Sequence, residues 1–192
     1  MRILVDALSR IPTVSVGTQA LIIGCLKILR RRFPDATFVM LTSHPAQERH
    51  YLDAIGCSIE YVERAASQGG TLRQFRAIVR RVDAVASAWG DGYVGKPARF
   101  LLQKALPLKR AGVPLILVTA SVGPFRPGLD ARLARWAFSL FDRLTVRDLN
   151  SQRYVRALGL ADVRCLPDTA FVLEPAAEAV VDDILRREGV PS

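Results

Sequence analysis

The sequence has few of the residues that build metal centres or disulfide frameworks. Its three cysteines, Cys25, Cys57 and Cys165, are odd in number, far apart and outside any CxxC pair, which favours buried reduced thiols over redox or zinc-binding roles. Its two histidines, His44 and His50, belong to no zinc-ligand motif. We therefore predict no metal site.

Long apolar segments are also missing. No apolar run approaches the roughly 18 residues that a membrane-spanning helix needs. The N-terminus meets Asp6 before an apolar stretch long enough for a secretory signal can form. These absences predict a cytoplasmic protein that makes, at most, peripheral contact with the inner membrane surface.

Basic residues outnumber acidic ones, but the excess positive charge is not concentrated in one part of the chain. The chain has 27 Lys and Arg against 18 Asp and Glu, a net charge of +9, and both halves are basic. Nucleic-acid binding usually gathers such charge on one face, so the even spread predicts no nucleic-acid partner. A phosphorylated substrate remains compatible with the charge.

What the sequence does have is a regular alternation of apolar runs and helical spacing. The predicted strands are Arg2–Leu8, Ala36–Leu41, Cys57–Val62, Asp83–Ala88, Val113–Ala120, Arg143–Val146 and Val163–Leu166. The predicted helices are Thr18–Phe33, one that begins near Pro45, Leu72–Val82, Ala98–Ala111, Leu129–Phe141, Asn150–Leu158 and Ala177–Glu188.

This order predicts a doubly wound α/β fold with a mostly parallel, Rossmann-like sheet. We assign residues 1–174 to this domain and residues 175–192 to a terminal helix or linker toward a second domain. In such sheets ligands bind outside the carboxyl ends of the strands, so the loops that follow strands are the ones to search.

The loop before the first helix ends in Ser15, Gly17, Thr18 and Gln19. A glycine beside the free N–H groups of a helix N-terminus can hold an anion. The alternative is that Thr18 only caps the helix. The segment contains neither a P-loop lysine nor a GxGxxG pattern.

A glycine-rich loop follows the strand at Asp83–Ala88. Gly90 and Gly92 allow a close backbone approach to a ligand, and Asp91 can accept hydrogen bonds from sugar hydroxyls. Trp89 and Tyr93 offer faces for sugar stacking. The alternative is a tight turn in which Asp91 caps its own backbone.

Two further strand ends carry candidate binding residues. Ser121 and Gly123 follow the apolar strand Val113–Ala120, although Ser121 lacks the flanking glycines of a hydrolase nucleophile elbow. Arg147 follows Arg143–Val146 and could face an anionic substrate, because its planar fork binds carboxylate or phosphate through two hydrogen bonds. The alternative is a structural ion pair with Asp148 or Asp168.

These segments together resemble the polysaccharide pyruvyl transferase family. The family patterns N-x-G-D-x-A, G-Q-S-x-G-P-F, V-R-D-x-x-S and P-D-x-A-F resemble Ser15–Ala20, Thr119–Phe125, Val146–Ser151 and Pro167–Phe171, and Trp89–Gly92 resembles a family glycine turn. Order and spacing agree over roughly residues 3–173. The departures are Ser15 and Thr18 for the family's asparagine and aspartate, and Thr119-Ala120 for its Gly-Gln, which remove polar groups from loops expected to line the cleft.

The resemblance implies one half of a B-type glycosyltransferase architecture, with the active site between two Rossmann-like halves. It implies phosphoenolpyruvate as the donor substrate, no cofactor, and a sugar or lipid-linked oligosaccharide as acceptor. The second half, as a domain or another chain, would supply much of the donor site and a histidine acid/base. We assign no catalytic residue to this chain and expect Trp89, Tyr93 and Phe125 to border an uncovered cleft.

Two alternatives stay open at this point. The chain could be the acceptor domain of a B-type glycosyltransferase that uses a nucleotide sugar. It could also be a non-catalytic interaction domain of the same fold, which the departures at Thr18 and Ala120 favour.

Overall fold

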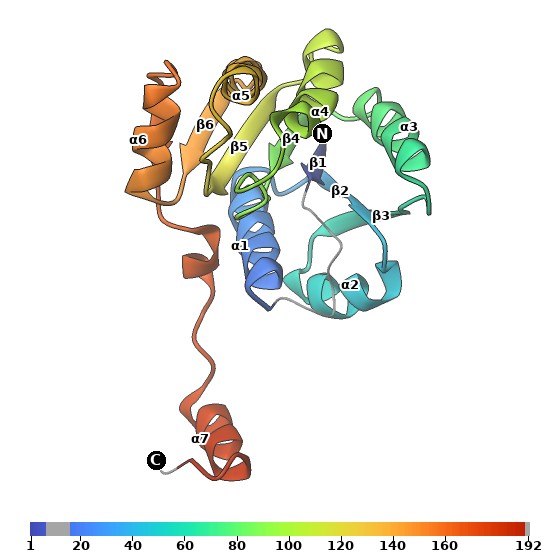
Figure 1. Cartoon of the computed structure of the whole chain (residues 1–192). Helices are drawn as coiled ribbons and strands as arrows, with labels where there is room; N and C mark the ends of the chain where they lie inside the picture. Colours follow the sequence, from blue (N-terminus) through green and yellow to red (C-terminus); the bar gives the residue numbers. More distant parts are fainter. Residues whose placement is uncertain (7–15, 191–192) are drawn as a thin grey trace.

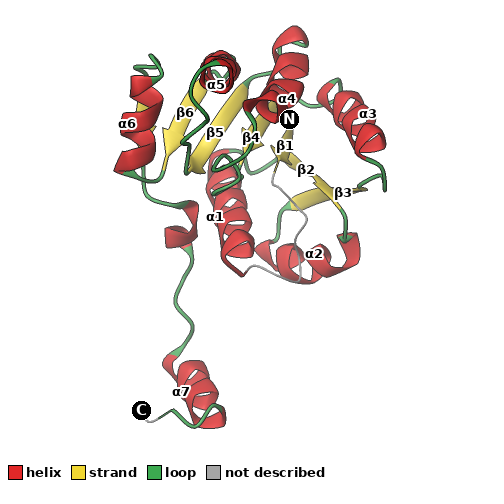
Figure 2. Cartoon of the chain, in the orientation of Figure 1, coloured by secondary structure: helices red, strands yellow, loops and turns green. Residues whose placement is uncertain are grey.

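The computed structural model describes residues 1–6 and 16–190 and shows a parallel sheet with helices on both faces (Figures 1 and 2). In chain order the elements are β1 (Arg2–Asp6), α1 (Val16–Arg32), β2 (Thr37–Thr42), α2 (Pro45–Leu52), the short 3₁₀ helix η1 (Asp53–Ile55), β3 (Ser58–Glu63), α3 (Gln68–Val79), β4 (Ala84–Ser87), α4 (Ala98–Arg110), β5 (Leu115–Ala120), α5 (Leu129–Ser139), β6 (Arg143–Val146), α6 (Leu149–Ala157), β7 (Val163–Cys165), the 3₁₀ helix η2 (Thr169–Val172) and α7 (Glu178–Arg187).

The seven strands lie in the order β3-β2-β1-β4-β5-β6-β7, and every pair of neighbours is parallel. The predicted doubly wound α/β fold is therefore confirmed. The chain winds outward from β1 in one direction and then from β4 in the other, so the topological switch point lies between these two strands. Crevices for ligands form at such points, outside the carboxyl ends of the strands.

The alternation of side chains along each strand divides the core between the two faces of the sheet. Ile3 and Val5 pack with Cys25 of α1, whereas Leu4 packs with Phe75 of α3 on the opposite face. Both sets are buried, which explains why the strand reads as a continuous apolar run rather than an alternating one.

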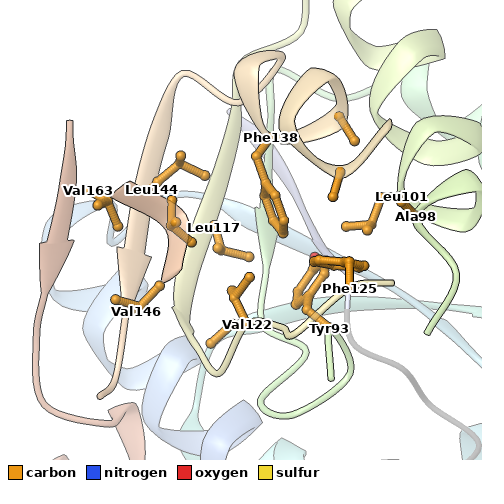
Figure 3. Packing of buried hydrophobic residues seen from close by; sticks show 14 residues of the cluster. Tyr93, Ala98, Leu101, Leu117, Val122, Phe125, Phe138, Leu144, Val146 and Val163 are labelled. Carbon is orange, nitrogen blue, oxygen red and sulfur yellow. The ribbon is translucent and has the colours of Figure 1, made fainter. Parts of the chain in front are cut away.

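A third apolar cluster lies between β5–β7 and the helices α4, α5 and α6 (Figure 3). Tyr93, Phe125 and Phe138 point toward one another in it, with ring centroids 5.7 Å apart for Tyr93–Phe138 and 6.1 Å for Phe125–Phe138. Tyr93 is 3% exposed and Phe125 is 6% exposed. The expectation that these two rings border an uncovered cleft is therefore wrong, because helix α5 already covers them.

The terminal helix α7 lies apart from the sheet (Figure 1). All of its residues are at least partly exposed, including the apolar side chains of Val180, Val181 and Ile184. No helix within the described ranges has the length and apolar character needed to cross a membrane. No group of three or more potential metal ligands occurs among these residues either.

Candidate functional site

Backbone hydrogen bonds bring the loops after β4, β5 and β6 together at the carboxyl edge of the sheet. The Ser121 N–H donates to the Gly90 carbonyl at 2.7 Å, and the Arg147 N–H donates to the Ala120 carbonyl at 3.3 Å. Three loops that are far apart in the sequence are thus adjacent, as the strand-end rule predicts.

Ser121 lies at the centre of a polar cluster at this edge. Its hydroxyl oxygen accepts a hydrogen bond from Arg147 Nε at 2.8 Å and donates one to Asp148 Oδ2 at 3.0 Å. Asp148 also caps helix α6, where it accepts from the N–H and the hydroxyl of Ser151, each at 2.7 Å. Partial burial tends to raise the pKa of Asp148, but the bonds from Ser151 and Ser121 and the charge of Arg147 together lower it. The carboxylate is therefore ionised at neutral pH.

Arg147 is held from its other side by Asp168. The distance from Nη1 to Asp168 Oδ2 is 2.9 Å, and the two side chains are 28% and 16% exposed. Asp168 in turn caps η2 through the N–H of Ala170. The structural pair considered from the sequence is thus present, with Asp168 rather than Asp148. Across the described chain, the remaining terminal nitrogen Nη2 has no hydrogen-bond partner, so the guanidinium keeps donors for an anion.

A pocket of about 370 Å³ adjoins this cluster, between the loop after β5 and the start of α6. Its lining residues are Val94, Ser121, Val122, Gly123, Pro124, Asp148, Asn150, Ser151 and Tyr154. Two of the predicted site residues, Ser121 and Gly123, therefore share one hollow.

A second polar cluster lies at the switch point. Lys104 Nζ on α4 lies 2.8 and 2.9 Å from the two carboxylate oxygens of Asp6, which ends β1. The indole of Trp89 donates to the same carboxylate at 3.0 Å, and Lys104 Nζ lies 3.7 Å from the centre of its ring. Burial lowers the pKa of Lys104, and the Asp6 carboxylate opposes that shift. This network fixes the base of the glycine-rich loop.

Sequence reasoning missed this second cluster. Asp6 had a detectable signal, because an acid at the end of a buried strand is unusual and points to a partner. Lys104 had none, since it is one of several basic residues on an amphipathic helix.

The glycine-rich loop forms a tight turn through backbone hydrogen bonds, and no described contact has the Asp91 side chain capping its own backbone. The Gly92 N–H donates to the Trp89 carbonyl at 2.8 Å, and the Val94 N–H donates to the Asp91 carbonyl at 2.9 Å. Gly90 has a positive φ of 55°, and a Cβ there would lie 2.7 Å from Leu21 Cδ1. Asp91 is exposed. The turn thus leaves its carboxylate facing solvent and brings Gly90 against α1.

The first predicted loop is placed only in part. Ser15 lies outside the described residues. Gly17, Thr18 and Gln19 form the first turn of α1, where Gly17 is exposed and the other two are half-buried. The approach of Leu21 to Gly90 shows that the early turns of this helix lie beside the glycine-rich loop.

Thr119, at the end of β5, has an unusual backbone. Its φ is +40°, a region that non-glycine residues rarely adopt, and its side chain is 5% exposed. The hydroxyl has no hydrogen-bond partner among the described residues. The family pattern introduced above has glycine at this position, and the positive φ gives a physical reason for that preference.

Comparisons with known proteins support this architecture. The family model described as polysaccharide pyruvyl transferase matches residues 16–191. The comparison with curated proteins finds no significant match. Among solved structures, Anabaena Alr3699/HepE in complex with UDP is 15% identical with a TM-score of 0.62, over 98% of this chain and 50% of that one. The UDP-GlcNAc 2-epimerase of Neisseria meningitidis bound to UDP-GlcNAc is 12% identical with a TM-score of 0.59, over 97% and 51%. The chain spans about half the length of these structures, and the likeness shows a shared fold.

Proposed function

The chain belongs to the polysaccharide pyruvyl transferase family, and from that premise we propose that it forms one half of an enzyme that transfers a pyruvyl group from phosphoenolpyruvate to a sugar of a cell-surface polysaccharide. The product is a ketal. Two sugar hydroxyls form C–O bonds to C2 of the donor, the bond from C2 to the phosphate oxygen breaks, and phosphate leaves. One hydroxyl proton balances the protonation of the donor's methylene and the other balances the released phosphate.

The observation that carries the proposal is the placement of Arg147. It lies at the carboxyl edge of the sheet, held by Ser121 and Asp168, with the nitrogen Nη2 left without a partner among the described residues. Phosphoenolpyruvate has a phosphate and a carboxylate, and a fixed guanidinium binds either through paired charge-assisted hydrogen bonds. Arg147 is therefore the residue of this chain that we assign to the donor.

The reaction also needs an acid for the methylene and a base for the sugar hydroxyl. We propose that a second β/α half, in the same polypeptide or another, supplies them. Two facts support this: the chain spans about half of the similar structures, and α7 exposes Val180, Val181 and Ile184 along a helix that lies apart from the sheet. An exposed apolar face of this kind is typical of a surface that packs against another domain.

The test combines the purified chain with the second half and supplies phosphoenolpyruvate and an oligosaccharide acceptor. We expect phosphate release together with a pyruvate ketal detected by mass spectrometry, and no product from the 192-residue chain alone. Arg147→Lys should weaken donor binding by about 1–3 kcal/mol, the range of one charge-assisted hydrogen bond. It should also lower Tm, because one ammonium cannot replace both the Nε bond to Ser121 and the Nη1 pair with Asp168. Lost stability with unchanged donor affinity would show that Arg147 is structural.

A second candidate is nucleotide-sugar binding, because HepE and the Neisseria meningitidis epimerase were solved with UDP and UDP-GlcNAc. Competition separates the two. If UDP displaces phosphoenolpyruvate from the completed protein, or if UDP binds and phosphoenolpyruvate does not, the result supports nucleotide-sugar binding. If neither ligand binds, the chain is a non-catalytic interaction domain of the same fold.

A further inference from the structure

The pocket between the β5 loop and α6 differs in charge from the surface around Arg147. Among the described residues that line it there is no lysine, arginine or histidine, although the chain as a whole has a net charge of +9. Its one charged group is the carboxylate of Asp148. Arg147 reaches Asp148 only through Ser121 and does not line the pocket, so a ligand inside meets the carboxylate and no cation, which suits a neutral molecule.

Its polar groups are hydrogen-bonding partners for hydroxyls. The Asp148 carboxylate accepts three hydrogen bonds, one from Ser121 and two from Ser151. About one of its four lone-pair positions is therefore left for a ligand. Asn150 is exposed at the mouth, and its amide has no partner among the described residues. An amide both donates and accepts, which matches the mixed donor and acceptor character of a sugar hydroxyl.

The remaining lining of the pocket is largely apolar. It includes Val94, Val122, Pro124 and the ring of Tyr154, whose hydroxyl accepts a hydrogen bond from the N–H of Phe125 at 2.9 Å. A pyranose ring has a C–H face and a rim of hydroxyls, so it can contact apolar and polar lining groups at once. The volume of about 370 Å³ is at the lower end of the roughly 300–1,000 Å³ found for small-ligand sites, which suits a small ligand.

Ser121 joins this pocket to the donor side. One hydroxyl group accepts from Arg147 Nε and donates to Asp148 Oδ2, so the guanidinium and the pocket lie on two sides of the same side chain. A neutral ring in the pocket would therefore sit next to an anion bound by Arg147.

We propose that this pocket binds the neutral sugar ring of the acceptor, with Asn150 as a specificity-determining residue that reads one of its hydroxyls. The assignment rests on the proposed function for the identity of the ligand as an acceptor.

The test uses the purified chain and a set of methyl hexopyranosides, observed by saturation-transfer NMR. We expect at least one glycoside to bind, and phosphoenolpyruvate not to displace it. Asn150→Ala should weaken that binding about three- to tenfold, the effect of one neutral hydrogen bond. Val94→Trp, which replaces a lining side chain with a larger indole, should abolish it. Arg153→Ala is the matched control, because Arg153 is exposed on the same helix and does not line the pocket.

Three outcomes would overturn the assignment: no glycoside binds, binding is unchanged in both pocket variants, or phosphoenolpyruvate competes for the same site. The proposed function can fail separately. If a glycoside binds as expected but the completed protein releases no phosphate from phosphoenolpyruvate, the sugar pocket stands and the pyruvyl transfer does not.

Discussion

Replacing Lys104 with methionine should lower the free energy of unfolding by about 2–4 kcal/mol, because it leaves the carboxylate of Asp6 without its ion partner. Removing one member of a fully buried ion pair typically costs about 3–5 kcal/mol. Here Asp6 is 7% exposed and the Lys104 side chain 26%, so water screens part of the pair and reduces the effect. Lys104 Nζ lies 2.8 and 2.9 Å from the two Asp6 oxygens, so this one ammonium provides most of the favourable interaction that offsets burial of the carboxylate charge.

A double replacement tests the cause. Asp6→Asn combined with Lys104→Met removes the unpaired charge, while the amide oxygen can still accept from the Trp89 indole. We expect the double variant to recover at least half of the stability that Lys104→Met loses, since the penalty comes from a buried charge rather than from lost packing.

Urea unfolding followed by far-ultraviolet circular dichroism measures these differences, with Trp fluorescence as a local probe of the loop that holds Trp89. Lys96→Met is the matched control, because Lys96 is exposed and has no ion-pair partner among the described residues. The reasoning fails if Lys104→Met unfolds within about 0.5 kcal/mol of the unmodified chain, the spread of ordinary surface substitutions. It also fails if the double variant is no more stable than the single one.

Three other predictions concern buried or half-buried side chains. Thr119→Val removes a buried hydroxyl without a described partner and keeps the side-chain shape, so it should raise the free energy of unfolding by about 1–2 kcal/mol in urea; a decrease would show that the hydroxyl is bound. Burial raises the pKa of Cys25 to about 12, so iodoacetamide should leave this thiol unmodified in the folded chain while the half-buried Cys57 and Cys165 react first. Peptide mass mapping that finds Cys25 labelled early would contradict its burial. The lowered pKa of Asp148 contributes stability that is present above its ordinary unfolded value and is lost as the pH falls through the folded value; Asp148→Asn should therefore flatten the acid limb of stability against pH, and an unchanged limb would refute the assigned hydrogen bonds.

Much of the fold was predictable because each element has its own local signal. The run at Val113–Ala120 indicates a buried strand, and the structure has β5 at Leu115–Ala120. Pro34 predicts a helix end, and α1 ends at Arg32. The seven strands and their helices were found in this way, because burial on both faces makes each strand apolar throughout. The predicted ends differ from the observed ones by a few residues.

The side chains of the loops were less predictable. Trp89 and Tyr93 were interpreted as faces for sugar stacking, and together with Phe125 they were expected to border a cleft that a second half would cover. The structure instead stacks Trp89 on Tyr93, with centroids 5.3 Å apart, and buries Tyr93 and Phe125 under α5. Whether an aromatic in a loop faces solvent depends on the next layer of helices, which local sequence does not encode.

From residue order alone came the parallel sheet, the family resemblance and the edge at which Arg147, Ser121 and Gly90 would gather. Only the tertiary structure decided that Arg147 pairs with Asp168 rather than with its neighbour Asp148. Asp148 is drawn away to cap α6, whereas Asp168 is brought to Arg147 by η2, which is anchored to α1 by the bond from Thr169 Oγ1 to the Leu21 carbonyl at 2.9 Å. The pairing is set by contacts between segments about 150 residues apart, and such contacts exist only once the chain has closed on itself.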